Sequence, residues 1–486
     1  MPTSFLKSAR LLPLLAAIAI PLPAQVADSA AVDAVFASWT GRNTPGCAVG
    51  VSRNGAVTLT RAYGMAHLEH DVPNTPATIF EAGSVSKQFT AASVALLVTE
   101  GKLSLADPVR KHFPELPPYG DSITVRQLLN HTSGLRDWGT VAAAGGWPRG
   151  TRTYTHAHVL DIIKRQRSLN YVPGAEYLYS NSNYNLAAML VERVAGMSLP
   201  QFTRTRFFEP LGMSSTSWRD DYARIVKNRA TAYAGVANMG YRQDMPFENV
   251  YGNSSLLTTV SDLLRWNEYL GKDAPAALRQ LMHERGRLNK GDTITYALGI
   301  VVDEYRGVRE VNHTGATAGY RAYLGRFPDQ GIGVALLCNT GSANPGALGH
   351  QVANVFLGNA LKPVVPPTAP AASGPGFVRI RSANGDTLVS ERDARWKPSA
   401  EELTQYSGRY SSDEAETSLT FSVQNGALMA TDRYGSSARL TPVYRDAFTR
   451  GGQLFRFRRD ARGTVNAVSL GLGRVRDLRF AKSPTR

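Results

Sequence analysis

Hydrophobic and polar positions alternate near the start of the chain and again before residue 340. Residues 46–62, GCAVGVSRNGAVTLTRA, form two apolar runs around Asn54-Gly55, a sequence typical of the tight turn of a β-hairpin. The stretch from about 80 to 281 has the pattern of helices and loops. Strand-like runs return at 296–303, 320–327 and 333–338. Strands at both ends of a helical middle predict an α+β domain whose terminal strands pair in one sheet.

A second region of short alternating runs follows, at 419–423, 428–431, 454–458, 465–470 and 475–480. Gly, Asn or Asp separates most of them, which is typical of a small antiparallel sandwich or barrel. Residues 362–376, KPVVPPTAPAASGPG, contain five prolines and little that could pack, which predicts an extended linker. We therefore expect a first domain over 28–361 and a β domain over 377–486.

The first residues have the pattern of a secretory signal peptide. Lys7 and Arg10 precede an apolar run over 11–20, and Ala24 and Ala27 both offer a cleavage site. A membrane anchor is the alternative, but spanning a bilayer takes about 20 apolar residues and this run is shorter. The sequence therefore predicts a cleaved signal peptide over 1–24, a secreted or periplasmic protein, and no stable membrane span.

Composition and charge exclude several classes of protein. The 486 residues are 43% hydrophobic and 19% charged, as in ordinary globular proteins, and suffice for two or three domains. The net charge of +15 raises the question of nucleic-acid binding. The basic residues are dispersed, however, and Arg456, Arg458 and Arg459 alternate with phenylalanines as on a solvated strand face. Because an exported protein meets little DNA, we expect no nucleic-acid partner.

The strongest candidate for chemistry is the segment 80–100, FEAGSVSKQFTAASVALLVTE. Ser84 and Lys87 lie three residues apart and share one face of a predicted helix that is apolar nearly all round. Burial and the positive helix N-terminus both disfavour an ammonium, so the pKa of Lys87 should fall towards that of a usable base. Ser84 would have backbone N–H groups nearby to hold an oxyanion. Alone, however, S-x-x-K is common, and a capping serine followed by an exposed lysine explains it more simply.

Two further motifs offer partners for this pair. Tyr179-Ser180-Asn181 lies in a polar loop before a second amphipathic helix, predicted over 186–195, and its tyrosine and amide alternate, so that both can face one cleft. Taken singly, an Asn/Ser-rich helix entry is the simpler interpretation. His313-Thr314-Gly315 opens a strand-like segment, where the glycine lets a substrate backbone lie close to an edge strand.

The order of these elements, S-x-x-K, then Y-S-N, then H-T-G, resembles that of the three motifs of the penicillin-recognising serine hydrolases. This family includes class C β-lactamases, DD-carboxypeptidases, D-aminopeptidases and related esterases. The surrounding text, including ITVRQLLNHTSGL and YSNSNYNLAAMLVERVAGMSLPQF, matches as well, over about residues 30–360. The resemblance implies an α/β/α sandwich with helices flanking an antiparallel sheet. The C-terminal region, with YSGRY, NGAL and FRFRRDARG, resembles the lipocalin-like barrel of D-aminopeptidase-like members, which either shapes substrate access or only adds stability.

By this resemblance the reaction is acyl transfer in two steps through an ester intermediate. Ser84 would be the acylated nucleophile, and Lys87 and Tyr179 would share the general-base and general-acid work. The backbone N–H groups of Ser84 and Ala316 would form the oxyanion hole. The resemblance implies no cofactor and no metal.

The resemblance also implies where substrate binds. Asn181 would orient the substrate amide, and His313, Thr314 and Gly315 would line the strand that docks the substrate. Class C β-lactamases have lysine in place of His313, whereas histidine resembles the DD-peptidase and D-aminopeptidase branches. We therefore expect a hydrolase of D-amino-acid peptides, amides or small esters, with peptidoglycan-derived peptides among the candidate substrates. A β-lactamase and a non-catalytic penicillin-binding sensor are the alternatives.

The cysteines and some of the histidines stand outside these motifs. The resemblance places Cys47 and Cys338 on neighbouring strands, where either a disulfide or two buried free thiols would fit. His67 and His70, beside Asp71, suggest a metal site, but no third ligand cluster accompanies them and we expect a structural role.

Overall fold

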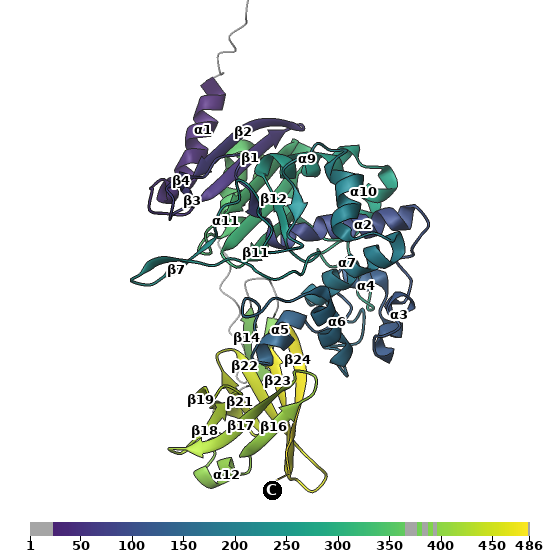
Figure 1. Ribbon diagram of the computed structural model, residues 1–486, viewed down its shortest axis with the longest axis vertical. Coiled ribbons are helices and arrows are strands. Elements are labelled where there is room, and N and C mark those ends of the chain that lie inside the picture. Colours follow the sequence, from purple (N-terminus) through teal and green to yellow (C-terminus); the bar gives the residue numbers. More distant parts are fainter. Residues whose placement is uncertain (1–22, 365–376, 382–386, 392–395, 485–486) are drawn as a thin grey trace, which may run out of the picture.

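The computed structural model describes residues 23–364, 377–381, 387–391 and 396–484 (Figure 1). Residues 1–22 of the expected signal peptide and residues 365–376 of the expected linker lie outside this description. Of the helices in the described ranges, none is both long and apolar enough to cross a membrane.

A six-stranded antiparallel sheet forms the centre of the first part of the chain. In spatial order its strands are β10 (Val301–Tyr305), β11 (Val308–Thr317), β12 (Tyr320–Phe327), β13 (Ile332–Cys338), β1 (Cys47–Arg53) and β2 (Ala56–Tyr63). The expected pairing of the terminal strands is confirmed, because β1 lies beside β13. The turn between β1 and β2 holds Asn54 and Gly55 at positive φ, as the predicted hairpin requires.

Helices cover both faces of this sheet, which confirms the expected α+β sandwich (Figure 1). On one face, Val49 and Leu336 belong to a buried cluster with residues of α1 (Pro23–Val35) and α11 (Pro345–Leu357). On the other face, Ala48 and Leu337 pack in the larger core with α2 (Lys87–Thr99) and α9 (Val260–Glu268). Since both faces are covered, β1 and β13 are buried almost throughout, and their sequences read as continuous apolar runs.

A helical region with three small sheets lies between β2 and β10. Its further helices are α3 (Val109–His112), α4 (Val125–Leu129), α5 (Trp138–Ala144), α6 (His156–Arg165), α7 (Asn181–Ala195), α8 (Leu199–Thr203) and α10 (Ala276–His283). Its strands are β3 (Met65–His67) and β4 (Val72–Pro73), β5 (Phe80–Glu81), β9 (Leu256–Thr258) and β6 (Ser217–Trp218), and β7 (Tyr233–Val236) and β8 (Gly240–Gln243).

Two predicted helices have different boundaries in this region. The segment 80–100 begins as strand β5, continues through a 3₁₀ turn over Gly83–Ser86, and becomes helix α2 only at Lys87. The helix predicted over 186–195 begins earlier, at Asn181.

The C-terminal region forms a nine-stranded antiparallel sheet that curls into a nearly closed barrel shape (Figure 1). In spatial order its strands are β19 (Ser437–Arg439), β18 (Ala427–Thr431), β17 (Thr417–Gln424), β16 (Gly408–Ser412), β24 (Val475–Lys482), β23 (Val465–Leu472), β22 (Gln453–Arg459), β21 (Ala447–Arg450) and β20 (Thr441–Tyr444). The short helix α12 (Ala400–Thr404) precedes it, and β14 (Phe377–Arg381) and β15 (Thr387–Glu391) pair separately. The expectation of a small antiparallel barrel is confirmed.

Charged side chains join the barrel to the helical region. Arg136, which is buried just before α5, forms an ion pair with Glu414 of the barrel and donates to the carbonyl of Asp477 on β24. Arg476 Nη1 lies 2.7 Å from a carboxylate oxygen of Glu176. The two parts are therefore docked by specific polar contacts.

Cys47 and Cys338 form a disulfide. They stand opposite each other in the register of β1 and β13, and both are fully buried. Of the two alternatives that the sequence left open, the structure has the bonded one.

Candidate active site

Ser84 lies in the 3₁₀ turn that leads into α2, and Lys87 is the first residue of that helix. Because the turn and the helix run on without a break, the two side chains still share one side. Lys87 Nζ lies 3.1 Å from Ser84 Oγ. The pairing predicted from S-x-x-K is therefore present, although Ser84 precedes the α-helix.

The Lys87 amine is enclosed by hydrogen-bond acceptors. It lies 3.0 Å from Asn181 Oδ1 and 2.6 Å from the carbonyl oxygen of Asn253, and neither of these oxygens can donate. A neutral amine has two hydrogens and one lone pair. If the hydrogens go to the two acceptors, the lone pair faces Ser84, which is the arrangement of a base ready to take the serine proton.

The surroundings of Lys87 favour this neutral form. The side chain is fully buried, and this burial, together with the positive charges of Arg474 and Arg149, holds its pKa well below the usual range. The Asp137 carboxylate acts in the opposite direction and raises the pKa less. Helix α2 is apolar on almost every side, so desolvation of this lysine follows directly from the sequence.

Tyr179 lies over the same amine, with Lys87 Nζ 4.7 Å from the centre of its ring. Burial raises the pKa of the Tyr179 hydroxyl, and the nearby Ser84 side chain offsets only part of the change. The hydroxyl makes no well-formed hydrogen bond to any residue in the described part of the chain. Tyr179 is thus protonated and lies beside the serine, and no competing partner takes the hydrogen of its hydroxyl group.

Asn181 is brought to the site by the first turn of α7. Its backbone N–H donates to a carboxylate oxygen of Asp137 at 2.8 Å, which anchors the start of the helix. Its side-chain oxygen is directed to Lys87, which leaves the amide N–H₂ group to meet a substrate. Tyr179 and Ser180 lie in the loop that the sequence predicted, whereas Asn181 already belongs to α7.

His313, Thr314 and Gly315 lie on β11, beyond the point where its neighbour β10 stops pairing. This part of β11 is an open edge, as expected for a strand that docks a substrate. His313 Nδ1 lies 2.6 Å from the carbonyl oxygen of Thr314, and Nε2 lies 3.0 Å from the Tyr296 hydroxyl. Burial and the neighbouring Lys87 lower the pKa of His313 to about 3, so the ring is neutral.

Gly315 is required by the packing of β11 against the serine turn. A Cβ on Gly315 would lie 2.0 Å from the carbonyl oxygen of Ala82 and 3.1 Å from the Ser84 nitrogen. A Cβ on Gly83, which has φ +52°, would lie 2.6 Å from the Ala316 nitrogen. Both glycines allow the two segments to touch, and this contact brings the N–H groups expected to form the oxyanion hole close together. Position 315 therefore requires glycine first of all because of this contact. From the sequence alone, the glycine is explained by the room that it leaves for a substrate.

A cavity of about 820 Å³ opens beside these groups. Of the residues predicted from the sequence it is lined by Ser84, Tyr179, Asn181, His313, Thr314, Gly315 and Ala316. Lys87 lies behind the serine. The structure thus gathers every predicted site residue at one place. Such a volume suits a small-molecule or short-peptide substrate.

The barrel contributes one residue to this cavity. Arg474 lies in the turn between β23 and β24, and its guanidinium carbon is 4.8 Å from the centre of the Tyr179 ring. One of its nitrogens lies 3.8 Å from the Asp137 carboxylate. Its backbone carbonyl accepts from Asn170 Nδ2 at 3.0 Å, so the turn is held by the backbone while the side chain is directed to the cavity.

Sequence reasoning missed several neighbours of the motif residues. His131 is fully buried under Tyr179, with ring centres 4.2 Å apart, and burial lowers its pKa well below the usual range. Tyr296 was assigned to a strand, but it holds His313 through its hydroxyl. The segment NHTSG and the turn after β23 were visible in the sequence, yet nothing local indicates that they reach the same cleft. In the described ranges no group of three or more His, Cys, Asp or Glu could hold a metal ion.

A family model described as Beta-lactamase matches residues 31–355. The chain belongs to the Beta-lactamase family. It is 27% identical over 508 residues to a D-aminopeptidase of Brucella ovis, and the match covers 90% of this chain and 96% of that protein. The resemblance inferred from the three motifs is thereby confirmed, and this member of the Beta-lactamase family is a serine hydrolase.

Solved structures share the fold. An octameric penicillin-binding protein homologue from Pyrococcus abyssi matches with a TM-score of 0.60 and 21% identity, over 94% of this chain and 99% of that chain. A D-amino acid amidase from Ochrobactrum anthropi SV3 matches with a TM-score of 0.58 and 22% identity, over 69% of this chain and 99% of that chain. At these identities the likeness supports the Beta-lactamase-family fold alone.

Proposed function

We propose that this protein is an exported serine hydrolase, secreted or periplasmic, that forms an acyl-enzyme on Ser84. Its substrates are peptides or amides that contain D-amino acids, or small esters. We assign catalysis to residues 28–361 and regard 377–486 as an accessory β domain joined by a Pro-rich linker. Export follows from the N-terminal pattern in the sequence. The substrate class is supported by the names of the relatives, a D-aminopeptidase and a D-amino acid amidase.

One observation carries the catalytic proposal: the buried Lys87 amine lies 3.1 Å from Ser84 Oγ while two obligate acceptors take its hydrogens. In this arrangement Lys87 removes the proton from Ser84, and the oxygen attacks the substrate carbonyl carbon. The N–H groups of Ser84 and Ala316 stabilise the oxyanion that forms. Tyr179, whose raised pKa keeps it protonated, gives its proton to the leaving nitrogen or oxygen and takes up the proton that Lys87 received from Ser84. Water then attacks the ester carbonyl carbon, the bond to Ser84 Oγ breaks, and one proton of the water returns to Ser84.

The first experiment compares wild type, Ser84→Ala and Ser93→Ala with the p-nitroanilides of D-alanine and L-alanine. Ser93 lies on the same helix and donates to the Phe89 carbonyl, so it is a matched serine outside the cavity. We expect release of p-nitroaniline from the D-isomer by wild type and Ser93→Ala, and none by Ser84→Ala. Equal turnover in Ser84→Ala would refute the assignment of the nucleophile.

Intact-protein mass after mixing with benzylpenicillin separates the alternatives. A Ser84 adduct that persists for hours indicates slow deacylation, as in a DD-peptidase. An adduct that disappears while penicillin is consumed identifies a β-lactamase despite the neutral His313. Penicillin binding without an adduct, and without turnover of amides or esters, would make the protein a sensor and overturn the catalytic proposal.

A further inference from the structure

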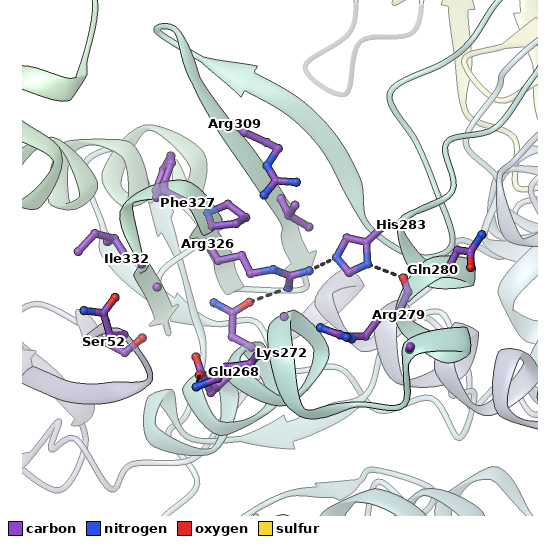
Figure 2. A pocket seen from close by; sticks show the side chains of 18 residues that line it. Ser52, Glu268, Lys272, Arg279, Gln280, His283, Arg309, Arg326, Phe327 and Ile332 are labelled. Atoms are coloured by element: carbon purple, nitrogen blue, oxygen red, sulfur yellow. Dashed lines mark hydrogen bonds and ion pairs between the residues drawn. The ribbon is translucent and has the colours of Figure 1, made fainter.

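A second cavity, of about 530 Å³, lies elsewhere in the first part of the chain (Figure 2). It is lined by α9 and α10, by the π-helical segment Tyr269–Asp273 that links them, and by β11, β12 and β13. It shares no lining residue with the cavity beside Ser84. The sequence analysis assigned nothing to this place.

The cavity contains a buried arginine that forms no ion pair within the described residues. Within the described ranges three arginines are buried, Arg136, Arg219 and Arg326. The first forms an ion pair with Glu414 and the second with Glu81. Arg326, which is 7% exposed, forms an ion pair with none of the described carboxylates. Burying an unpaired charge is costly, so natural proteins pair such groups with an opposite charge or with a bound ion.

The contacts that Arg326 does make are neutral. Nη1 lies 3.2 Å from Asn267 Oδ1, and Nη2 donates to His283 Nε2. The other ring nitrogen of His283 lies 2.6 Å from the backbone oxygen of Arg279, which can only accept, so this nitrogen carries the hydrogen. Burial and Arg326 lower the pKa of His283 to about 4, and the ring is neutral at physiological pH. Figure 2 shows Arg326 reaching towards His283.

The remaining charges of the lining leave an excess of two positive charges. Lys272 lies 3.8 Å from Glu268, and Arg309 lies 2.9 Å from Asp329, so these two cations are balanced. Arg326 and Arg279 have no ion-pair partner, and the Glu268 carboxylate, which pairs with Lys272, offsets the charge of Arg326 only in part. The guanidinium of Arg279 makes no hydrogen bond or ion pair within the described residues, and its Nε is buried without a partner. Two guanidinium groups with free N–H donors therefore border one cavity of ligand size.

We infer that this cavity binds a phosphate group as a dianion, with Arg326 and Arg279 as its principal donors. Planar guanidinium groups match the oxygen spacing of phosphate and form paired, charge-assisted hydrogen bonds with it. The charge of a phosphate dianion equals the unbalanced charge of the lining. The same chemistry is offered by inorganic phosphate and by an organic phosphate monoester, and the volume accommodates either. The inference is independent of the proposed function.

The test is isothermal titration calorimetry on the full chain carrying Ser84→Ala, at constant ionic strength. The probes are inorganic phosphate, phenyl phosphate and succinate, a dicarboxylate of the same charge. We expect saturable binding of one equivalent of phosphate or phenyl phosphate, and the tighter of the two identifies the source. When Arg279→Gln is added to this protein, the dissociation constant for the phosphate ligand should rise by about tenfold or more, because a charge-assisted contact is lost.

Arg285→Gln is the matched control, since Arg285 follows α10 but does not line the cavity. It should bind as the parent does. Thermal melts of all three proteins verify that they are folded. The inference is overturned if the parent shows no saturable binding, if Arg279→Gln binds phosphate as tightly as the parent, if Arg285→Gln loses as much affinity, or if succinate binds as well as phosphate.

Discussion

Replacing Arg474 with glutamine should raise the pH at which Ser84 becomes reactive. Lys87 Nζ and the Arg474 guanidinium carbon lie 4.7 Å and 4.8 Å from the centre of the Tyr179 ring, so they are at most 9.5 Å apart. At an effective dielectric constant of about 20, two like charges at that distance repel by about 1.7 kcal/mol, or about 1.3 pH units. Arg474 is 25% exposed and partly neutralised by Asp137, which reduces the expected effect to about 0.5–1 pH unit.

The direction of this effect follows from the charge. Arg474 disfavours the Lys87 ammonium, so its removal raises the pKa of Lys87, and a higher pH is needed to obtain the free amine. The assay measures the second-order rate constant for labelling of Ser84 by a fluorophosphonate, and intact-protein mass follows the labelled fraction from about pH 5 to about pH 10. The rising limb of the wild-type profile reports Lys87, and in Arg474→Gln it should move upward. Because the backbone carbonyl holds the turn, the variant should stay docked.

Arg479→Gln provides the control, since Arg479 is on the same hairpin but pairs with Asp477 within the barrel and does not line the cavity. Its profile should match the wild type. A profile of Arg474→Gln that coincides with the wild type, or an equal movement in Arg479→Gln, would refute the electrostatic account.

Three further changes test the fold and the site. Glu414→Gln leaves Arg136 buried without a counter-charge, so it should lower the free energy of unfolding by about 3 kcal/mol, measured by urea titration. A loss of less than about 0.5 kcal/mol would contradict this prediction. Gly315→Ala pushes β11 away from the serine turn and should slow fluorophosphonate labelling by about a hundredfold with unchanged circular dichroism; wild-type labelling contradicts it. Reducing the Cys47–Cys338 disulfide should cost up to about 5 kcal/mol of stability, so the same unfolding curve with and without reductant argues against it.

Strands could be predicted from the sequence because each apolar or alternating run is bounded by its own turn signals. The runs at 320–327 and 333–338 are β12 and β13, and the five C-terminal runs all fall within strands of the barrel. The strand predicted over 296–303 is only partly confirmed. Its second half enters β10, whereas Tyr296 turns into the active site, where an aromatic residue has the same apolar signature as a strand residue.

The start of α7 shows why polar residues mislead a pattern-based prediction. Asn181, Ser182 and Asn183 are buried, although their residue types suggest a solvated loop. Ser182 Oγ accepts from the backbone N–H of Trp138, and Asn183 Oδ1 accepts from the Ser133 hydroxyl at 2.6 Å. Burial of polar groups is tolerated because their partners come from segments far away in the sequence. No local pattern carries that information, and the same holds for the place of Arg474.

The position of Arg474 also links the protonation of Lys87 to the docking of the barrel. The sheet, α2 and the Ser84–Lys87 pair belong to the part that emerges first from the ribosome, whereas the turn after β23 is translated hundreds of residues later. Until the barrel docks, Lys87 lacks one of the charges that keep it unprotonated. On the proposed mechanism, we therefore expect the first part of the chain alone to need a higher pH than the docked protein for Ser84 to react.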